Sequence, residues 1–146
     1  MKLTKLLQNK LILASKSKVR GDILKAHEID FEVEPSFIDE DIIKDSLKKE
    51  GATPEIVSKN LAEIKAQKIS QKKPERLVLG ADSVIDLNNE IISKPKTRSE
   101  ALQILKNLNG RQHYLISSVC IVKNGSMIWN YTDKAILTMK NLTNKE

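Results

Sequence analysis

Apolar and polar positions follow two rhythms along this chain, and each rhythm predicts a different kind of element. Short apolar runs at 11–13 and 77–81 are typical of strands buried on both faces. Residues 31–34 alternate apolar with charged side chains, which predicts a half-buried strand. Apolar residues recur at helical spacing over 18–27 and 54–70. Strands and helices therefore alternate through the first half of the chain, which favours an α/β fold.

The second half of the chain carries stronger hairpin signals. Asn88-Asn89 makes a plausible turn that leads the preceding strand back into 90–93. Asn124-Gly125 is the strongest hairpin signal in the chain. Three further strands are predicted, at 115–122, 127–131 and 135–139. We therefore expect a twisted mixed β-sheet flanked by helices, with a substrate cleft at the strand ends.

Hydroxyl residues, proline and glycine mark the ends of the predicted helices. Thr53-Pro54 combines a hydroxyl N-cap with proline at the first helical position. Thr97 and Glu100 form a capping box, and Gly110 is the expected C-cap of the helix that follows. The stripes expected to face the core are Val57, Leu61, Ile64 and Lys68 in the earlier helix and Ala101, Leu102, Leu105 and Leu108 in the later one.

Three stretches are less determined by their pattern. Lys65 lies off the apolar stripe of its helix, so the pattern alone favours a solvent-facing lysine. The charged residues 42–51 fit either a short helix or a mobile loop. Residues 141–146 resemble the start of a helix.

The polar turn between the first strand and the first helix is the first candidate site. It places Ser15, Lys16, Ser17, Lys18 and Arg20 at a helix N-terminus. Free backbone N–H groups and the helix dipole favour an anion there, and the cations add charge-assisted hydrogen bonds. The alternative is that Ser17 is only an N-cap and the lysines form a solvated face.

Two carboxylates supply the second candidate site. Asp82 lies near the C-terminal end of a buried strand, where it fits a general base, an Mg²⁺ ligand or a turn-capping residue. Glu40, which follows Asp39, fits either a second Mg²⁺ ligand or an exposed acidic turn. Neither His27 nor His113 has the spacing of a metal ligand.

Composition narrows the classes of protein. At 146 residues we expect one domain over 1–146, with no membrane-spanning segment and no secretion signal. The net charge of +6 favours phosphorylated ligands, but aromatic residues at 3% are too few for a nucleic-acid stacking platform. The single cysteine, Cys120, lies in an apolar run and reads as an inert core thiol, which fits a reducing cytoplasm.

The motifs, taken in order, resemble one known family. LILASKSKVRGDILKAHEIDFEVEPSFIDE at 11–40 resembles the opening of the Maf family of nucleotide pyrophosphatases. Four later segments are similar to Maf motifs in the same order: EIKA at 63–66, GADSV at 80–84, SKP at 93–95 and LNGRQH at 108–113. The resemblance implies hydrolysis of a nucleoside triphosphate to a monophosphate and pyrophosphate, with Mg²⁺ or Mn²⁺ as cofactor.

The resemblance also implies roles for single residues. Asp82 matches the family's proton acceptor, and its other active-site positions are matched by Ser15, Arg20, Glu40, Lys65 and Lys94. Together with the residue patterns above, this predicts catalytic roles for Asp82, Glu40, Lys65 and Lys94, phosphate binding by Ser15, Ser17 and Arg20, and a metal site at Glu40 and Asp82. As a hypothesis, the cations neutralise the triphosphate and the departing pyrophosphate.

Departures from the family pattern leave specificity and activity open. Val19 stands at a position that is a cation in members acting on dTTP or UTP and an aromatic in those acting on 7-methyl-GTP. Ser83 replaces the usual threonine and leans toward the dTTP/UTP group. The chain ends before a glycine-rich segment found in the family, so the alternative is a catalytically impaired nucleotide-binding protein. Resemblance alone also implies a possible homodimer and a link to septum formation.

Overall fold

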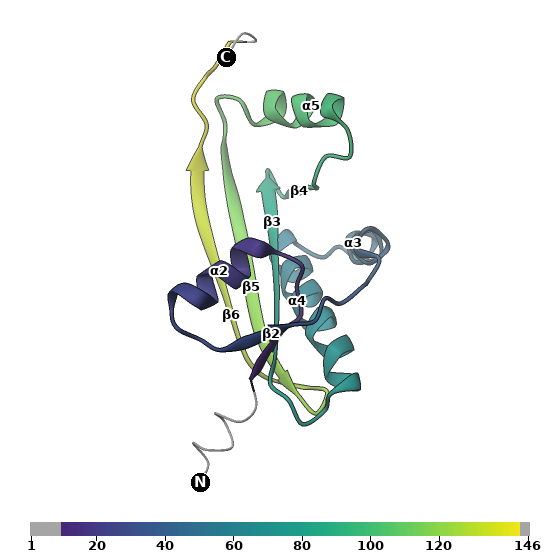
Figure 1. Ribbon diagram of the computed structural model, residues 1–146. Coiled ribbons are helices and arrows are strands. Elements are labelled where there is room, and N and C mark those ends of the chain that lie inside the picture. Colours follow the sequence, from purple (N-terminus) through teal and green to yellow (C-terminus); the bar gives the residue numbers. More distant parts are fainter. Residues whose placement is uncertain (1–9, 144–146) are drawn as a thin grey trace.

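The strands form one mixed sheet, as the pattern predicts. The computed structural model describes residues 10–143. Its six-stranded sheet has the order β2-β1-β3-β5-β6, with β4 paired to β3 (Figure 1). The strands are β1 (Leu11–Leu13), β2 (Phe31–Val33), β3 (Val78–Leu87), β4 (Glu90–Ile92), β5 (Gln112–Lys123) and β6 (Ser126–Thr138). The β1 pairings are parallel and the remaining ones are antiparallel.

Within residues 10–143 the sheet is accompanied by four helices, and each begins at a side-chain cap. They are α2 (Lys18–Ala26), α3 (Glu40–Lys49), α4 (Pro54–Lys72) and α5 (Arg98–Leu108). The capping side chains of Ser17, Asp39, Thr53 and Thr97 each accept a hydrogen bond from the backbone N–H three residues on. Residues 42–51, whose sequence fitted either a short helix or a mobile loop, therefore lie mostly in the helix α3. A helix was suggested over 141–146, but residues 141–143 have no regular structure and the remaining three lie outside the described residues. Residues 1–9, for which no secretion signal is expected, also lie outside them.

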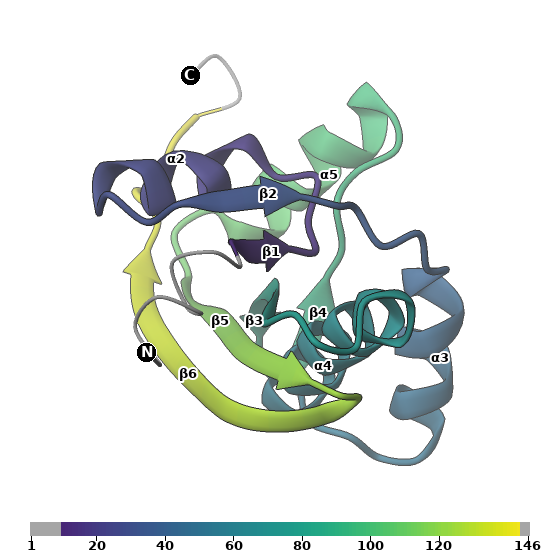
Figure 2. The same cartoon turned by 60° about the horizontal axis from the view of Figure 1, so that its bottom comes forward.

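The core lies between α4 and the central strands. Ala62, Ala66 and Ile69 of α4 pack with Ile12, Ala14, Val78, Cys120 and Val122. A Cβ added at Gly80 would lie 2.1 Å from the carbonyl oxygen of Ala62, so only glycine permits this approach of strand to helix. Strands β5 and β6 curve around α4 (Figure 2), which encloses one face of that helix.

The face that α4 buries differs from the predicted stripe. Val57 and Leu61 are buried as expected, but Ile64 and Lys68 are only partly buried. Lys65 is buried instead, which contradicts the solvent-facing position favoured by the pattern. The reason is that small residues, Ala62 and Ala66, bring the helix against Gly80 and turn the side chain of Lys65 toward the sheet.

Two details of the second half also differ from the prediction. The strands expected at 127–131 and 135–139 are one continuous strand, β6. In α5 only Leu108 is buried, while Leu102 and Leu105 are exposed. This helix lies beyond the end of β3 in Figure 1, so its apolar stripe does not pack on the sheet core. The hairpin at Asn124-Gly125 is confirmed, with φ of 53° and 74° that suit a type I′ turn.

Candidate functional site

Most of the predicted site residues surround one cavity of about 870 Å³. Four segments form it: the turn after β1 with the start of α2, the loop 36–41, α4 through Lys65, and the segment after β4 through Lys94. Its lining residues include Ser15, Lys16, Ser17, Arg20, Phe37, Glu40, Lys65 and Lys94. The cavity therefore gathers cations and hydroxyls from segments far apart in the sequence.

The turn between β1 and α2 is organised around Ser15. Its Oγ accepts hydrogen bonds from the backbone N–H of Ser17 at 3.1 Å and from Nη1 of Arg20 at 2.9 Å. Ser17 caps α2 by accepting from the backbone N–H of Arg20 at 3.4 Å. The N-cap interpretation of Ser17 is thus confirmed, and its hydroxyl hydrogen remains available as a donor. The contact with Ser15 holds the Arg20 guanidinium at the cavity wall.

The opposite wall is a loop whose backbone is tied down at several points. The backbone N–H of Glu34 donates to the carbonyl of Leu13 at 3.0 Å, and Ser36 Oγ donates to the carbonyl of Ala14 at 3.4 Å. Lys68 Nζ donates to the carbonyl of Phe37. These bonds connect the loop to β1 and α4, and so fix the point at which α3 and Glu40 begin.

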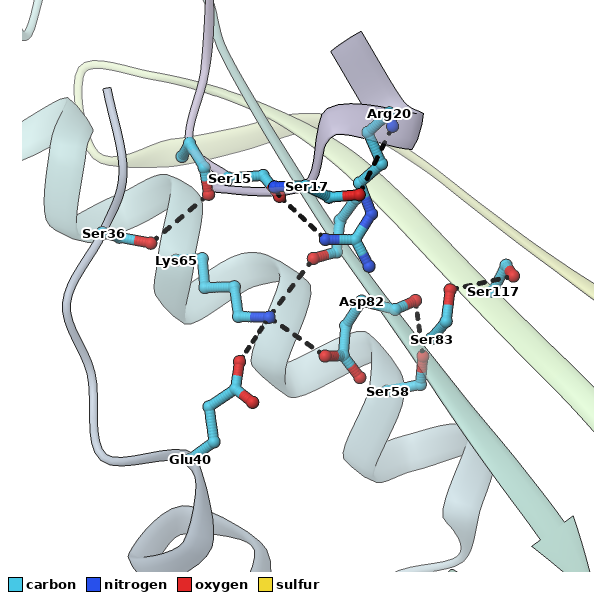
Figure 3. A network of polar contacts seen from close by, with 12 residues as sticks. Ser15, Ser17, Arg20, Ser36, Glu40, Ser58, Lys65, Asp82, Ser83 and Ser117 are labelled. Atoms are coloured by element: carbon cyan, nitrogen blue, oxygen red, sulfur yellow. Dashed lines mark hydrogen bonds and ion pairs between the residues drawn. The ribbon is translucent and has the colours of Figure 1, made fainter. Parts of the chain in front are cut away.

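Lys65 lies at the centre of the polar cluster (Figure 3). Its Nζ is 2.6 Å from Oε1 of Glu40 and 3.0 Å from Oδ1 of Asp82. The carbonyl of Ala81 accepts a third contact at 3.5 Å. With 8% of its surface exposed, Lys65 needs these partners, because a buried ammonium without them would be costly.

Asp82 lies behind Lys65, on the face of β3 that packs against α4. It is buried, and its backbone carbonyl accepts a hydrogen bond from Ser58 Oγ at 3.2 Å. Its Oδ2 is buried without a hydrogen-bond partner. Burial raises the pKa of Asp82 above its ordinary value, and the charge and hydrogen bond of Lys65 offset only part of that rise.

Glu40 is the more exposed of the two carboxylates, with 39% of its side chain accessible against 6% for Asp82. Burial acts to raise the pKa of Glu40 as well. The hydrogen bond and charge of Lys65 outweigh it, so the pKa of Glu40 lies below its ordinary value. One lysine thus holds two carboxylates whose pKa values are displaced in opposite directions.

The two carboxylates fit a hard divalent cation only in part. In the residues 10–143 no group of three His, Cys, Asp or Glu side chains is placed to hold a metal ion. The unpartnered Oδ2 of Asp82 and the accessible carboxylate of Glu40 are nevertheless oxygen donors of the type that Mg²⁺ prefers. Such an ion would complete its shell with water or with phosphate oxygens from a ligand.

Both residues predicted to set specificity lie outside this cavity lining. Ser83 follows Asp82 along β3 and therefore points to the opposite face, where its Oγ shares a hydrogen bond with Ser117 Oγ at 3.1 Å. Val19 is 67% exposed at the start of α2.

The structure adds residues that the sequence reasoning missed. Ser58 lies on the same face of α4 as Lys65, seven residues earlier, and that helical spacing was a usable signal. Phe37 lines the cavity and is 66% exposed, with Lys16 Nζ 4.2 Å from its ring centroid. In the sequence, only its position as a large apolar residue two places before the acidic pair Asp39-Glu40 marked Phe37.

The remaining reactive side chains lie in the scaffold. Cys120 belongs to the core, and burial raises its pKa to about 11, which confirms an unreactive thiol. His27 is the C-cap of α2, and His113 is buried near the start of β5. No helix within residues 10–143 has the length and apolar character needed to span a membrane.

Comparisons with known proteins agree with the motif order. The family model described as Maf-like protein matches residues 10–146. A protein of Pelagibacter ubique named nucleoside triphosphate pyrophosphatase is 68% identical over 91% of this chain, and the match covers 68% of that protein. A 7-methyl-GTP pyrophosphatase of Rhizobium etli is 38% identical over 92% of this chain and 67% of its own. The chain thus spans about two thirds of the length of these curated relatives.

Solved structures agree on the fold. A HAM1 protein from Coxiella burnetii superposes with a TM-score of 0.55 at 15% identity, over 88% of this chain and 70% of that one. The Ham1 protein of Staphylococcus aureus gives a TM-score of 0.52 at 14% identity over the same shares. At this level of identity the likeness shows a common architecture and carries no residue roles.

Proposed function

The chain belongs to the Maf-like protein family, and from that premise we propose that it hydrolyses a nucleoside triphosphate to a nucleoside monophosphate and pyrophosphate. One observation carries the proposal. Buried Lys65 and Asp82 form a cluster with the more exposed Glu40, and Glu40 and Lys65 line the same cavity as Arg20 and Lys94. Cleavage of a phosphoanhydride needs charge neutralisation and an activated water, and this site offers groups for both.

The triphosphate binds between the turn after β1 and Lys94. Ser15, Ser17 and the N-terminus of α2 present hydroxyl and N–H donors, and Arg20 presents a guanidinium fork. Lys94 and Lys65 act as point charges on the departing pyrophosphate. Because these groups come from three separate segments, their fixed spacing selects a chain of phosphates over a single one.

Asp82 takes the proton from the attacking water. The water oxygen bonds to the α-phosphorus while the bond from that phosphorus to the bridging oxygen breaks. That oxygen leaves with the electron pair as part of pyrophosphate. The raised pKa of Asp82 suits this role, since a base with a pKa nearer to neutrality holds the proton better than an ordinary carboxylate. Before the nucleotide binds, Glu40 pairs with Lys65 and balances its charge.

Glu40 and Asp82 would also hold the cofactor, Mg²⁺ or Mn²⁺, which supplies charge stabilisation on the phosphates and a more acidic bound water. The orphaned Oδ2 of Asp82 supports this assignment, because a buried carboxylate oxygen without a hydrogen-bond donor is costly unless a ligand satisfies it.

The substrate class is a pyrimidine or a modified purine triphosphate. The name of the relative called 7-methyl-GTP pyrophosphatase supports a modified purine, whereas Ser83 leans toward the dTTP/UTP group by family resemblance. Val19 is the residue to test for the choice of base, because it is exposed at the start of the phosphate-binding helix. The backbone direction of β3 turns Ser83 away from Lys65, so any effect of Ser83 on the base passes through Ser117 and the opposite face of the sheet.

Nucleotide binding without turnover is the second candidate function. The ion pairs of Lys65 favour it, because they engage both carboxylates that would hold the metal and activate water. The reducing cytoplasm is the proposed location, supported by the single buried cysteine and by a nucleotide substrate. A homodimer is proposed from family resemblance alone.

Pyrophosphate release decides between the two functions. The full chain is assayed with dTTP, UTP, CTP and 7-methyl-GTP, each with Mg²⁺ or Mn²⁺, beside an Asp82→Asn control. We expect metal-dependent release that the control lacks. Nucleotide binding with no release from any of the four substrates would establish the binding protein instead. Less than about tenfold loss in the control would remove Asp82 from the role of base.

A further inference from the structure

We propose that the ammonium group of Lys65 holds the divalent-cation position closed until a nucleotide arrives, so that metal and nucleotide enter together. This inference rests on the proposed function for the identity of the ligand. It concerns the resting protein, however, and can be measured without turnover.

The ammonium group of Lys65 lies among three oxygen atoms that could otherwise bind a cation. Its Nζ is 2.6 Å from Glu40 Oε1 and 3.0 Å from Asp82 Oδ1, and the carbonyl of Ala81 lies 3.5 Å away. Two carboxylate oxygens and a carbonyl are the ligand types that a hard divalent cation takes. The ammonium thus occupies the centre of an oxygen cage that would otherwise suit such a cation.

Burial shows that Lys65 also closes the way in. Lys65 and Glu40 line the cavity, whereas Asp82 does not. Figure 3 shows the lysine stem reaching across from α4, with its tip between the two carboxylates. A cation coming from the cavity therefore meets the ammonium before it can reach Asp82, and the two positive charges repel.

A triphosphate changes this balance. Lys65 is joined to α4 by a flexible stem, and its Nζ faces a cavity that already contains Arg20 and Lys94. A phosphate oxygen in that cavity offers the ammonium a new partner. Lys65 can then turn toward the phosphate without leaving its charge unpaired, and both carboxylates become free to bind a cation.

Direct titration of Mn²⁺ into the nucleotide-free protein tests the first half of the proposal. Manganese binding is followed by electron paramagnetic resonance for the wild type and for Lys65→Met, which keeps a long side chain without charge. We expect the variant to bind Mn²⁺ at least about tenfold more tightly than the wild type. Equal Mn²⁺ affinities of the two proteins would overturn the proposal. Tight binding of Mn²⁺ to the wild type in the absence of nucleotide would also overturn it.

Two control variants distinguish direct occupation of the cation position by Lys65 from the effect of net positive charge near the carboxylates. Lys44 acts on both carboxylates only through its charge, so Lys44→Met should change Mn²⁺ affinity less than about threefold. A gain in Lys44→Met as large as in Lys65→Met would show that net charge, and not occupancy by Lys65, excludes the metal. Adding Asp82→Asn to Lys65→Met should remove the gain, because the cage then loses a carboxylate.

The second half of the proposal is tested on the wild type, which avoids any folding defect of a variant. A non-hydrolysable triphosphate analogue with a methylene group between the α- and β-phosphorus should reveal a tight Mn²⁺ site. That gain should exceed the affinity of Mn²⁺ for the analogue alone, and Asp82→Asn should lose it. No gain over the analogue alone would overturn the proposal. Absence of pyrophosphate release beside the expected Mn²⁺ results would instead count against the proposed function.

Discussion

Two regions of this molecule depart from the usual burial of side chains in opposite senses. Near the turn after β1, a lysine and an aspartate are buried, with 8% and 5% of their surfaces exposed. Along β6 and α5, large apolar side chains are exposed, including Trp129 at 48% and Tyr131 at 57%. These two rings stack on each other with centroids 6.5 Å apart. Judged by burial alone, both regions would be expected to destabilise the folded protein.

The difference lies in the partners that each region has. In the polar region around Lys65, the lysine forms ion pairs with Glu40 and Asp82, and Arg20 donates a hydrogen bond to Ser15. In the part of the chain that the structure describes, Trp129 and Tyr131 contact each other on the sheet face away from α4. Buried charge with specific partners indicates a site whose geometry is maintained for chemistry. Exposed apolar surface by itself identifies no ligand.

The first prediction removes the charge of Asp82, the proposed base. Asp82→Asn should lower kcat for pyrophosphate release by at least about a hundredfold, because general-base catalysis contributes that much or more. Its melting temperature should change little or rise, since the variant removes a buried carboxylate and keeps the Lys65–Glu40 pair. Stopped-assay kinetics and a thermal melt measure the two effects. A large drop in both would mean that Asp82 maintains the fold rather than the reaction.

The second prediction tests the close packing that brings Lys65 over the sheet. Gly80→Ala should lower the free energy of unfolding by about 3 kcal/mol, because its Cβ would collide with backbone of α4. Gly21→Ala is the matched control in α2, where the new Cβ meets the Phe31 ring at an ordinary 3.5 Å. It should stabilise the protein by about 0.5 kcal/mol through helix propensity. Urea unfolding of both variants checks the pair, and equal effects would contradict it.

The third prediction concerns pH and the coupling of the two carboxylates. Asp82 must be ionised to accept a proton, and its pKa is raised, so the acid limb of kcat/KM should lie above the ordinary carboxyl pKa of about 4. The negative charge of Glu40 contributes to that rise. Glu40→Gln should therefore lower the pKa of Asp82 and move the acid limb to lower pH, even though the rate itself falls. A limb that stays in place or moves upward in the pH profile would show that another group controls it.

The fourth prediction addresses the exposed apolar region, where the smallest effect is expected. Trp129→Ser should lower the free energy of unfolding by no more than about 1.5 kcal/mol, because 48% of the residue is exposed and its stacking partner Tyr131 is exposed as well. Pyrophosphate release should be unchanged. Urea unfolding measures the stability. A cost above about 2 kcal/mol would show that this surface is covered in solution, and light scattering would then identify self-association.

Sequence reasoning located the elements well wherever the signal was local. Caps at Thr53 and Thr97 and the Asn124-Gly125 turn are confirmed, since each depends on backbone groups a few residues away. The split of β6 was predicted wrongly because Thr132, Asp133 and Lys134 interrupt the apolar pattern. The backbone pairing continues through them, and Thr132 Oγ1 even shares a hydrogen bond with Ser118 Oγ at 3.0 Å.

The hydrophobic pattern of the sequence predicted the site residues less well than it predicted the helices and strands. The buried face of α4 consists largely of small and polar residues, so it shows little hydrophobic contrast, and Lys65 was identified only through family resemblance. Strand alternation could have shown that Ser83 faces away from Asp82. The cavity itself depends on tertiary packing, which brings residues 15–20, 36–41, 65 and 94 together.

The hairpin of β5 and β6 has a consequence for the order of folding. It pairs neighbouring segments through a two-residue turn, and that turn is anchored to α4 by the Gly125 N–H donating to Ser70 Oγ at 2.9 Å. Strand β1 must instead find β3 across more than sixty residues, from Leu13 to Leu79. We expect the hairpin and α4 to assemble first, and the turn after β1, which we propose binds phosphate, to form last. Substitutions at Gly125 should then slow refolding, whereas those at Leu13 should mainly speed unfolding in stopped-flow experiments. The segment proposed to recognise the ligand would be the last to form.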